Sequence, residues 1–190
     1  MKIKNVFFLF LLISAHHFYG NSFGETDLIF AVKQGDNQKV KEVLKNNSNI
    51  INQYNSIGMT ALMYAVIENK SSVVTELLKQ KELDVNQQDN YKRTALMYAI
   101  QYGNNEIVKQ LLQHLKLDIN LQDNLGWTAL IYAIEFGNVE AVETLNNDKR
   151  VNLALKDNNN HTAYYHALNP DRGLQIPRTA LSAIQKMVKP

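Results

Sequence analysis

The sequence contains no cysteine, and it has only three prolines and eight glycines among 190 residues. The absence of cysteine excludes a disulfide framework, a cysteine-ligated zinc site, a thiol nucleophile and a cysteine-anchored lipoprotein. The scarcity of proline and glycine excludes collagen-like chains and long flexible linkers. A hydrophobic fraction of 45% with 20% charged residues instead indicates a globular chain that can bury a core.

A large charge of either sign is also missing. The formal net charge is +2, and loss of Lys2 and Lys4 with the N-terminal segment would leave 18 basic and 18 acidic residues. Such a balanced chain lacks the basic footprint of a nucleic-acid-binding protein. We therefore expect no nucleic-acid partner.

Residues 1–24 have the layout of a secretory signal peptide. Lys2 and Lys4 precede an apolar run from Val6 to Ile13, and a more polar stretch follows it. Small residues favour cleavage after Ser22 or Gly24. The apolar run is far shorter than the ~20 residues of a membrane-spanning helix. The sequence thus predicts export to the periplasm or the medium, and no membrane span after cleavage.

The remaining chain, residues 25–190, repeats itself every 34 residues. Five segments align without gaps, and each has a threonine at its start and an alanine five residues later. These segments are residues 26–32, 60–66, 94–100, 128–134 and 162–168. Five in-phase copies predict five stacked structural units. Their expected bounds are about 25–57, 58–91, 92–125, 126–159 and 160–190, the last with a C-terminal cap.

Each unit is predicted to contain two helices and an extended turn. The threonine, Thr60 for example, can cap the first helix through its hydroxyl. An apolar stripe at helical spacing marks the second helix, as in Val73, Val74, Leu77 and Leu78. Asparagine and aspartate then favour a turn. In the last unit the second helix is expected to start late, near Pro177 to Thr179.

The repeat resembles the ankyrin repeat, and residues 123–130 match that family's turn and first-helix signature best. The tetratricopeptide repeat has the same period, but its Trp/Leu-Gly/Tyr pattern is missing. Alanine replaces the proline of the ankyrin signature, and Lys92 and Asn160 occupy its hairpin glycine position. The resemblance implies an all-α solenoid of five 34-residue helix-turn-helix-hairpin units that binds proteins.

Motifs of known chemistry are absent from the sequence. It has no nucleophile turn with Ser-His-Asp spacing, no glycine-rich phosphate loop and no H-E-x-x-H. His16 and His17 lie in the predicted signal peptide, His114 is isolated, and His161 and His166 flank a predicted helix start. A zinc site needs three or four converging ligands. We therefore interpret the last three as surface histidines, and predict no metal site, no cofactor and no catalytic residue.

What remains as a candidate site is a surface. In the family that the chain resembles, partners dock on the hairpin tips and on the concave face of the first helices. At these positions the middle units carry apolar, aromatic and arginine side chains, the types that anchor interfaces. The predicted partner-binding residues are Met59, Ile67, Tyr91, Arg93, Tyr102, Leu125, Trp127, Phe136 and His161.

Two interpretations of this surface stay open. In the first, Trp127 is largely exposed and these residues bind a partner. In the second, they cover one another, with Arg93 stacked over Trp127 as a cation–π pair. A second aromatic column, Phe30, Tyr64, Tyr98 and Tyr132, is interpreted as packing.

We predict from these patterns an exported, monomeric, non-catalytic module that binds another protein. An inhibitor or immunity protein that blocks a partner enzyme or toxin is the alternative. An enzyme with an unrecognised site is less favoured.

Overall fold

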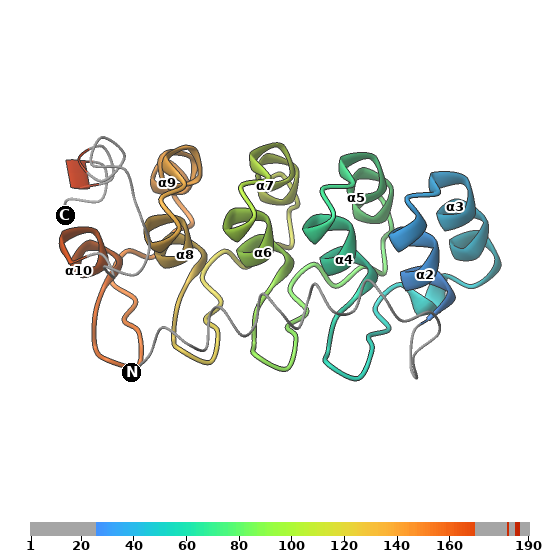
Figure 1. The fold of residues 1–190 in the computed structure, drawn as a ribbon, viewed down its shortest axis with the longest axis horizontal. Coiled ribbons are helices and arrows are strands. Elements are labelled where there is room, and N and C mark those ends of the chain that lie inside the picture. The colour runs from blue at the N-terminus through green and yellow to red at the C-terminus, as the bar shows by residue number, and fades with distance from the viewer. Residues whose placement is uncertain (1–25, 170–181, 183–184, 187–190) are drawn as a thin grey trace.

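The computed structural model describes residues 26–169, 182 and 185–186. Within these residues, four helix pairs stack in a row (Figure 1). The pairs are α2 (Asp27–Gln34) with α3 (Asn37–Asn46), α4 (Ala61–Ile67) with α5 (Ser71–Leu78), α6 (Ala95–Gln101) with α7 (Asn105–Leu112), and α8 (Ala129–Glu135) with α9 (Val139–Asn146). A short 3-10 helix η2 (Ser48–Ile50) follows α3, and α10 (Ala163–Leu168) begins the fifth unit. Residues 26–169 contain helices and no strand longer than an isolated bridge, which confirms the predicted all-α solenoid.

Two of the predicted features cannot be compared with this structure. The signal peptide at residues 1–24 and the start of the last helix near Pro177 lie outside the described residues. Within the described ranges, every helix is too short or too polar to cross a bilayer.

A threonine begins the first helix of every unit, as predicted. The hydroxyl of Thr94 accepts a hydrogen bond from the backbone N–H of Met97 at 3.3 Å. The same bond is made by Thr26, Thr60, Thr128 and Thr162. Each hydroxyl satisfies one of the N–H groups that a helix start leaves without a partner.

The core lies between two layers of helices. The first helices α2, α4, α6, α8 and α10 pack in sequence against one another, and the second helices α3, α5, α7 and α9 form the other layer (Figure 1). The repeated alanine of the first helices, such as Ala99 or Ala133, is fully buried. A side chain this small lets consecutive helices approach closely, and the stripe of Val73, Val74 and Leu77 fills the space behind them.

Asparagine side chains link successive units. The side-chain amide of Asn86 donates to the carbonyl of Lys116, and its oxygen accepts from the N–H of Asp118, both at 2.7 Å. Asn52 and Asn120 repeat this pair of bonds one unit away on either side. These bonds give partners to backbone groups in segments that lack helix or sheet, so the asparagines at fixed positions hold the stack together.

In the second to fifth units, the hairpin that precedes the first helix turns through a left-handed residue. This residue is Gly58, Lys92, Gly126 or Asn160, with φ of 81°, 59°, 78° and 66°. At Gly126 a Cβ would lie 2.7 Å from the backbone nitrogen of Asn158 in the next hairpin. Glycine therefore allows both the left-handed backbone conformation and the close approach of neighbouring hairpins. Lys92 adopts the same conformation although it has a side chain.

Candidate partner-binding surface

The residue at the tip of each middle hairpin is exposed. Ile57, Tyr91 and Leu125, which we name the tip row, keep 41%, 45% and 55% of their surface accessible. Neighbouring tips are tied by backbone bonds, since Asn90 N–H donates to Ile57 O at 3.2 Å and Asn124 N–H to Tyr91 O at 3.0 Å. The tip row is thus a series of apolar side chains repeated once per unit on a hydrogen-bonded frame.

An aspartate or asparagine shapes each tip from inside the hairpin. Oδ1 of Asp89 accepts from the N–H groups of Tyr91 and Arg93, both at 2.8 Å. Asp123 and Asp157 do the same in the next two hairpins, and Asn55 does so in the second unit. Side chains of this type stabilise turns by bonding backbone two to four residues ahead. The tip row is therefore held in place before any partner binds.

Met59 and Arg93 do not lie on the surface, although both positions were expected there. They retain 4% and 6% of their accessible surface. The Arg93 guanidinium pairs with Asp89 at 3.1 Å and lies over the rings of Tyr91 and Tyr98, 4.8 Å and 4.6 Å from their centroids. The stacking of Arg93 over Trp127, which the second interpretation of this surface included, is therefore wrong, because the carboxylate of its own hairpin holds Arg93 inside.

Trp127 is partly buried, so the expectation that it is largely exposed is also wrong. Its ring meets Tyr132 and His166 edge-on, with centroid distances of 5.7 Å and 5.6 Å, and it packs against the core. His161, at the same position one unit later, is partly buried as well and stacks on Tyr165 at 3.7 Å.

The predicted positions on the first helices are half-buried. Ile67, Tyr102 and Phe136, which we name the inner row, each pack one side against the core. Tyr102 stacks on Tyr98 at 6.5 Å, and Phe136 stacks on Tyr132 at 5.8 Å. The buried tyrosines thus join the hairpins to the inner row.

These contacts form a continuous line of stacked side chains, mostly aromatic, in each of two units; we name these the aromatic lines. In the third unit the line runs through Tyr91, Arg93, Tyr98 and Tyr102. In the fourth unit it runs through Trp127, Tyr132 and Phe136. Of the second aromatic column, Tyr98 and Tyr132 are core residues as expected, whereas Phe30 is 51% exposed in the first unit.

Sequence reasoning missed the polar contacts below this surface. The Tyr98 hydroxyl donates to Asp89 at 2.6 Å, and that of Tyr132 donates to Asp123 at 2.8 Å. The repeat itself carried the signal, because tyrosine follows the hairpin acid by nine residues in both units. Burial raises the pKa of Tyr98 and of Tyr132 far above the ordinary value, and the neighbouring carboxylates add to the shift.

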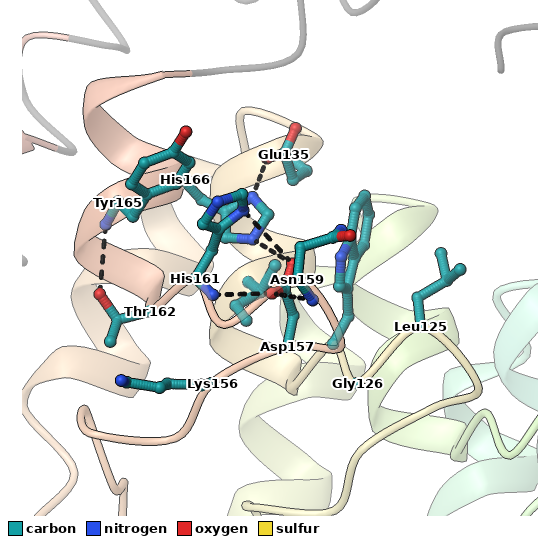
Figure 2. A network of polar contacts seen from close by, with 12 residues as sticks. Leu125, Gly126, Glu135, Lys156, Asp157, Asn159, His161, Thr162, Tyr165 and His166 are labelled. Carbon is teal, nitrogen blue, oxygen red and sulfur yellow. Dashed lines mark hydrogen bonds and ion pairs between the residues drawn. The ribbon is translucent and has the colours of Figure 1, made fainter. Parts of the chain in front are cut away.

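In the fifth unit a histidine replaces this tyrosine. His166 is buried, so its interpretation as a surface histidine was wrong. Its Nε2 lies 3.1 Å from Oδ2 of Asp157, and its Nδ1 is hydrogen-bonded to Oε1 of Glu135 on α8 (Figure 2). Burial alone would lower the pKa of His166, but the hydrogen bonds and negative charges of Glu135 and Asp157 raise it.

Comparison with known proteins adds two findings. A family model described as "Ankyrin repeats (3 copies)" matches residues 3–89, 28–123, 66–157 and 96–173. The chain is also similar to a solved structure titled "Crystal Structure of EF0377 an Ankyrin Repeat Protein", with 28% identity and a TM-score of 0.75 over 88% of this chain and 81% of that one. No curated protein sequence matches the chain.

Proposed function

The chain belongs to the ankyrin-repeat family, and we propose that it is an exported module that binds a protein partner through its tip row and inner row. Ankyrin repeats generally mediate protein–protein interaction, and the fold is typically non-catalytic. The tip row supplies exposed apolar side chains, and the inner row supplies one isoleucine and two aromatic side chains that are half-buried.

The observation that supports this proposal best is that the aromatic lines are continuous from the hairpin to the inner row. In the third unit they connect exposed Tyr91 to half-buried Tyr102 through two buried side chains. A binding surface backed by fixed rings loses little conformational entropy when a partner docks. Aromatic side chains of this kind account for much of the binding energy at protein interfaces. The surface therefore combines exposure with rigidity, as an interaction site requires.

Export is proposed from the N-terminal pattern of Lys2, Lys4 and the apolar run that follows them. The partner would accordingly be a protein of the periplasm or the medium. Mass spectrometry of the chain from its native host should find a mature N-terminus at Phe23 or Glu25. Intact Met1 on the soluble cytoplasmic protein would contradict export.

Partner capture with paired variants tests the surface itself. Leu125 and Leu115 are both exposed leucines, at 55% and 98%, but Leu115 lies in the turn after α7 and outside the tip row. The purified chain should retain a partner from extracts of its host, Leu125→Ala should reduce that retention, and Leu115→Ala should leave it unchanged. Equal retention by both variants would contradict the proposed surface.

A further inference from the structure

Three potential metal ligands converge at the hairpin of the fifth unit. Asp157 lies in the turn, His161 precedes the cap residue of α10, and His166 lies within α10 (Figure 2). One ligand atom from each falls within 4.8 Å of the other two. The sequence predicted no such site, because residues five and nine apart meet here only through the hairpin fold.

The distances among these atoms fit a small ion. Oδ2 of Asp157 lies 3.1 Å from Nε2 of His166 and 3.9 Å from Nδ1 of His161. Bonds of about 2.0–2.1 Å place the ligand atoms of a tetrahedral zinc ion roughly 3.4 Å apart. All three ligand atoms lie within 4.8 Å of one another, so the side chains must draw somewhat closer together to bind one ion.

The ligand atoms are oriented by contacts on their far sides. Oδ1 of Asp157 accepts from the N–H groups of Asn159 and His161 at 2.9 Å and 2.8 Å, which leaves Oδ2 facing the two imidazoles. Glu135, itself buried, is hydrogen-bonded to Nδ1 of His166, so that Nε2 faces Asp157. A carboxylate behind a histidine is the usual support of a metal-binding imidazole, since it fixes the tautomer and the ring.

The other hairpins lack the two histidine ligands. The positions of His161 and His166 are held by Met59 and Tyr64, Arg93 and Tyr98, and Trp127 and Tyr132 in the preceding units. The position of Glu135 is held by Lys33, Ile67 and Gln101. If the fifth unit needed only a substitute for the Tyr–Asp hydrogen bond, His166 alone would supply it. That need does not account for the second imidazole, His161, which lies 3.9 Å from the same carboxylate oxygen.

The cluster is accessible from one side. The side chains of Asp157 and His166 are 1% and 9% exposed, while that of His161 is 33% exposed. An ion can therefore enter beside His161, and water can complete its coordination as in zinc sites with three protein ligands.

We propose that Asp157, His161 and His166 bind one divalent transition-metal ion of the zinc type. Two imidazole nitrogens and one carboxylate oxygen suit such ions better than Mg²⁺ or Ca²⁺, which prefer oxygen ligands alone. The bound ion links the fifth hairpin to α10, and through Glu135 the site is continuous with α8. The site would thus stabilise the end of the stack independently of any partner.

Titration of the full chain with Zn²⁺ tests the proposal. Calorimetry should show one ion bound per chain at micromolar concentrations, and Mg²⁺ should not compete. Trp127 is the one tryptophan of the sequence, and its ring lies 5.6 Å from that of His166. Titration with paramagnetic Co²⁺ should therefore quench the tryptophan fluorescence with the same stoichiometry.

Two variants replace a ligand histidine with the residue found at the same position of another unit. His161→Met carries the residue of the second unit and leaves the contact of His166 with Glu135 intact, while His166→Tyr restores the Tyr–Asp pair of the middle units. Each should fold, by circular dichroism, and should weaken zinc binding by about 100-fold or more. Glu135→Gln should weaken it by ~10-fold while the stoichiometry stays at one.

A variant of His114, which lies outside both the cluster and the predicted signal peptide, is the matched control. His114→Ala should bind Zn²⁺ like the wild type. Zinc should also raise the melting temperature of the wild type and not that of His161→Met. The proposal is overturned if the wild type binds no zinc at micromolar concentrations, or if folded His161→Met binds zinc as tightly as the wild type.

Discussion

The Tyr98 hydroxyl donates a 2.6 Å hydrogen bond to a carboxylate oxygen of Asp89 below the hairpin of the third unit. Both residues are buried. The other oxygen of Asp89 holds two backbone N–H groups of the hairpin, so one aspartate joins the turn to the first helix. Asp123 and Tyr132 make the same connection one unit later. The hairpins of the third and fourth units are therefore each attached to their helix by a phenol in its neutral form.

This attachment predicts a loss of stability at alkaline pH. Burial raises the pKa of both phenols in the folded chain, whereas in the unfolded chain they titrate near 10. The folded state thus holds these protons more tightly. The corresponding stability is complete below about pH 10 and falls above it by ~1.4 kcal/mol per pH unit for each tyrosine. Urea unfolding at a series of pH values measures this slope.

The control for this prediction removes the two hydroxyl groups. The double variant Tyr98→Phe with Tyr132→Phe should be less stable at neutral pH, because Asp123 loses its phenol partner. Above pH 10 its stability should fall less steeply than that of the wild type. Parallel slopes for the two proteins would show that other groups cause the alkaline unfolding.

The repeat architecture was predictable because its causes are local and recur in phase. The Thr94 hydroxyl caps a helix by accepting a hydrogen bond from the N–H group three residues later. Ala99 is buried, and alanine recurs at its position in every unit where consecutive helices touch. The same chemistry returns every 34 residues, so one unit reports on the next. A residue that occurs in one unit alone cannot be compared with its equivalents in this way.

The candidate site was only partly predictable, because burial of a polar side chain depends on contacts in three dimensions. Arg93 was expected at the surface, but Asp89 and two aromatic rings hold it inside. His166 was expected at the surface too, and its buried partner Glu135 belongs to the preceding unit. A change of residue type within a repeated column, here tyrosine to histidine, is the signal that marks such an exception.

The left-handed Lys92 predicts a stabilising substitution. Its φ is 59°, a conformation that costs a residue with a side chain roughly 1 kcal/mol and glycine little. Lys92→Gly should therefore raise the free energy of unfolding by ~0.5–1 kcal/mol in chemical denaturation. Gly126→Ala is the converse change and should destabilise the chain, since its Cβ would meet the backbone of Asn158 at 2.7 Å. If Lys92→Gly destabilised the protein, the turn at this position would differ from the one described.

The buried alanine of the third unit predicts a cost for added volume. Ala99 is fully buried in α6, which packs between α4 and α8. Ala99→Leu should lower the free energy of unfolding by ~1–3 kcal/mol, because a well-packed core has no space for three more carbon atoms. Hydrogen exchange should show the loss in the adjoining units as well, since their stability is coupled. An unchanged melting temperature would place Ala99 outside the packed interface.

The most informative comparison for function is between Trp127 and Leu125, which lie two residues apart on one hairpin. Trp127 is partly buried against Tyr132 and His166, whereas Leu125 is 55% exposed. Trp127→Ala should therefore lower the free energy of unfolding by about 2 kcal/mol, less than truncation of a fully buried tryptophan. Leu125→Ala should change it by less than ~0.5 kcal/mol.

Binding should show a different pattern in the same two variants. Leu125→Ala should weaken affinity for a captured partner while the fold stays intact, because its side chain lies at the exposed end of the surface. Trp127→Ala should also weaken binding, because the Trp127 ring supports Tyr132, which stacks on Phe136 of the inner row; this effect comes together with its effect on stability. Thermal unfolding and titration calorimetry on both proteins separate the two effects. If Trp127→Ala is destabilised and both variants bind like the wild type, the aromatic lines serve the packing of the stack and the partner docks elsewhere.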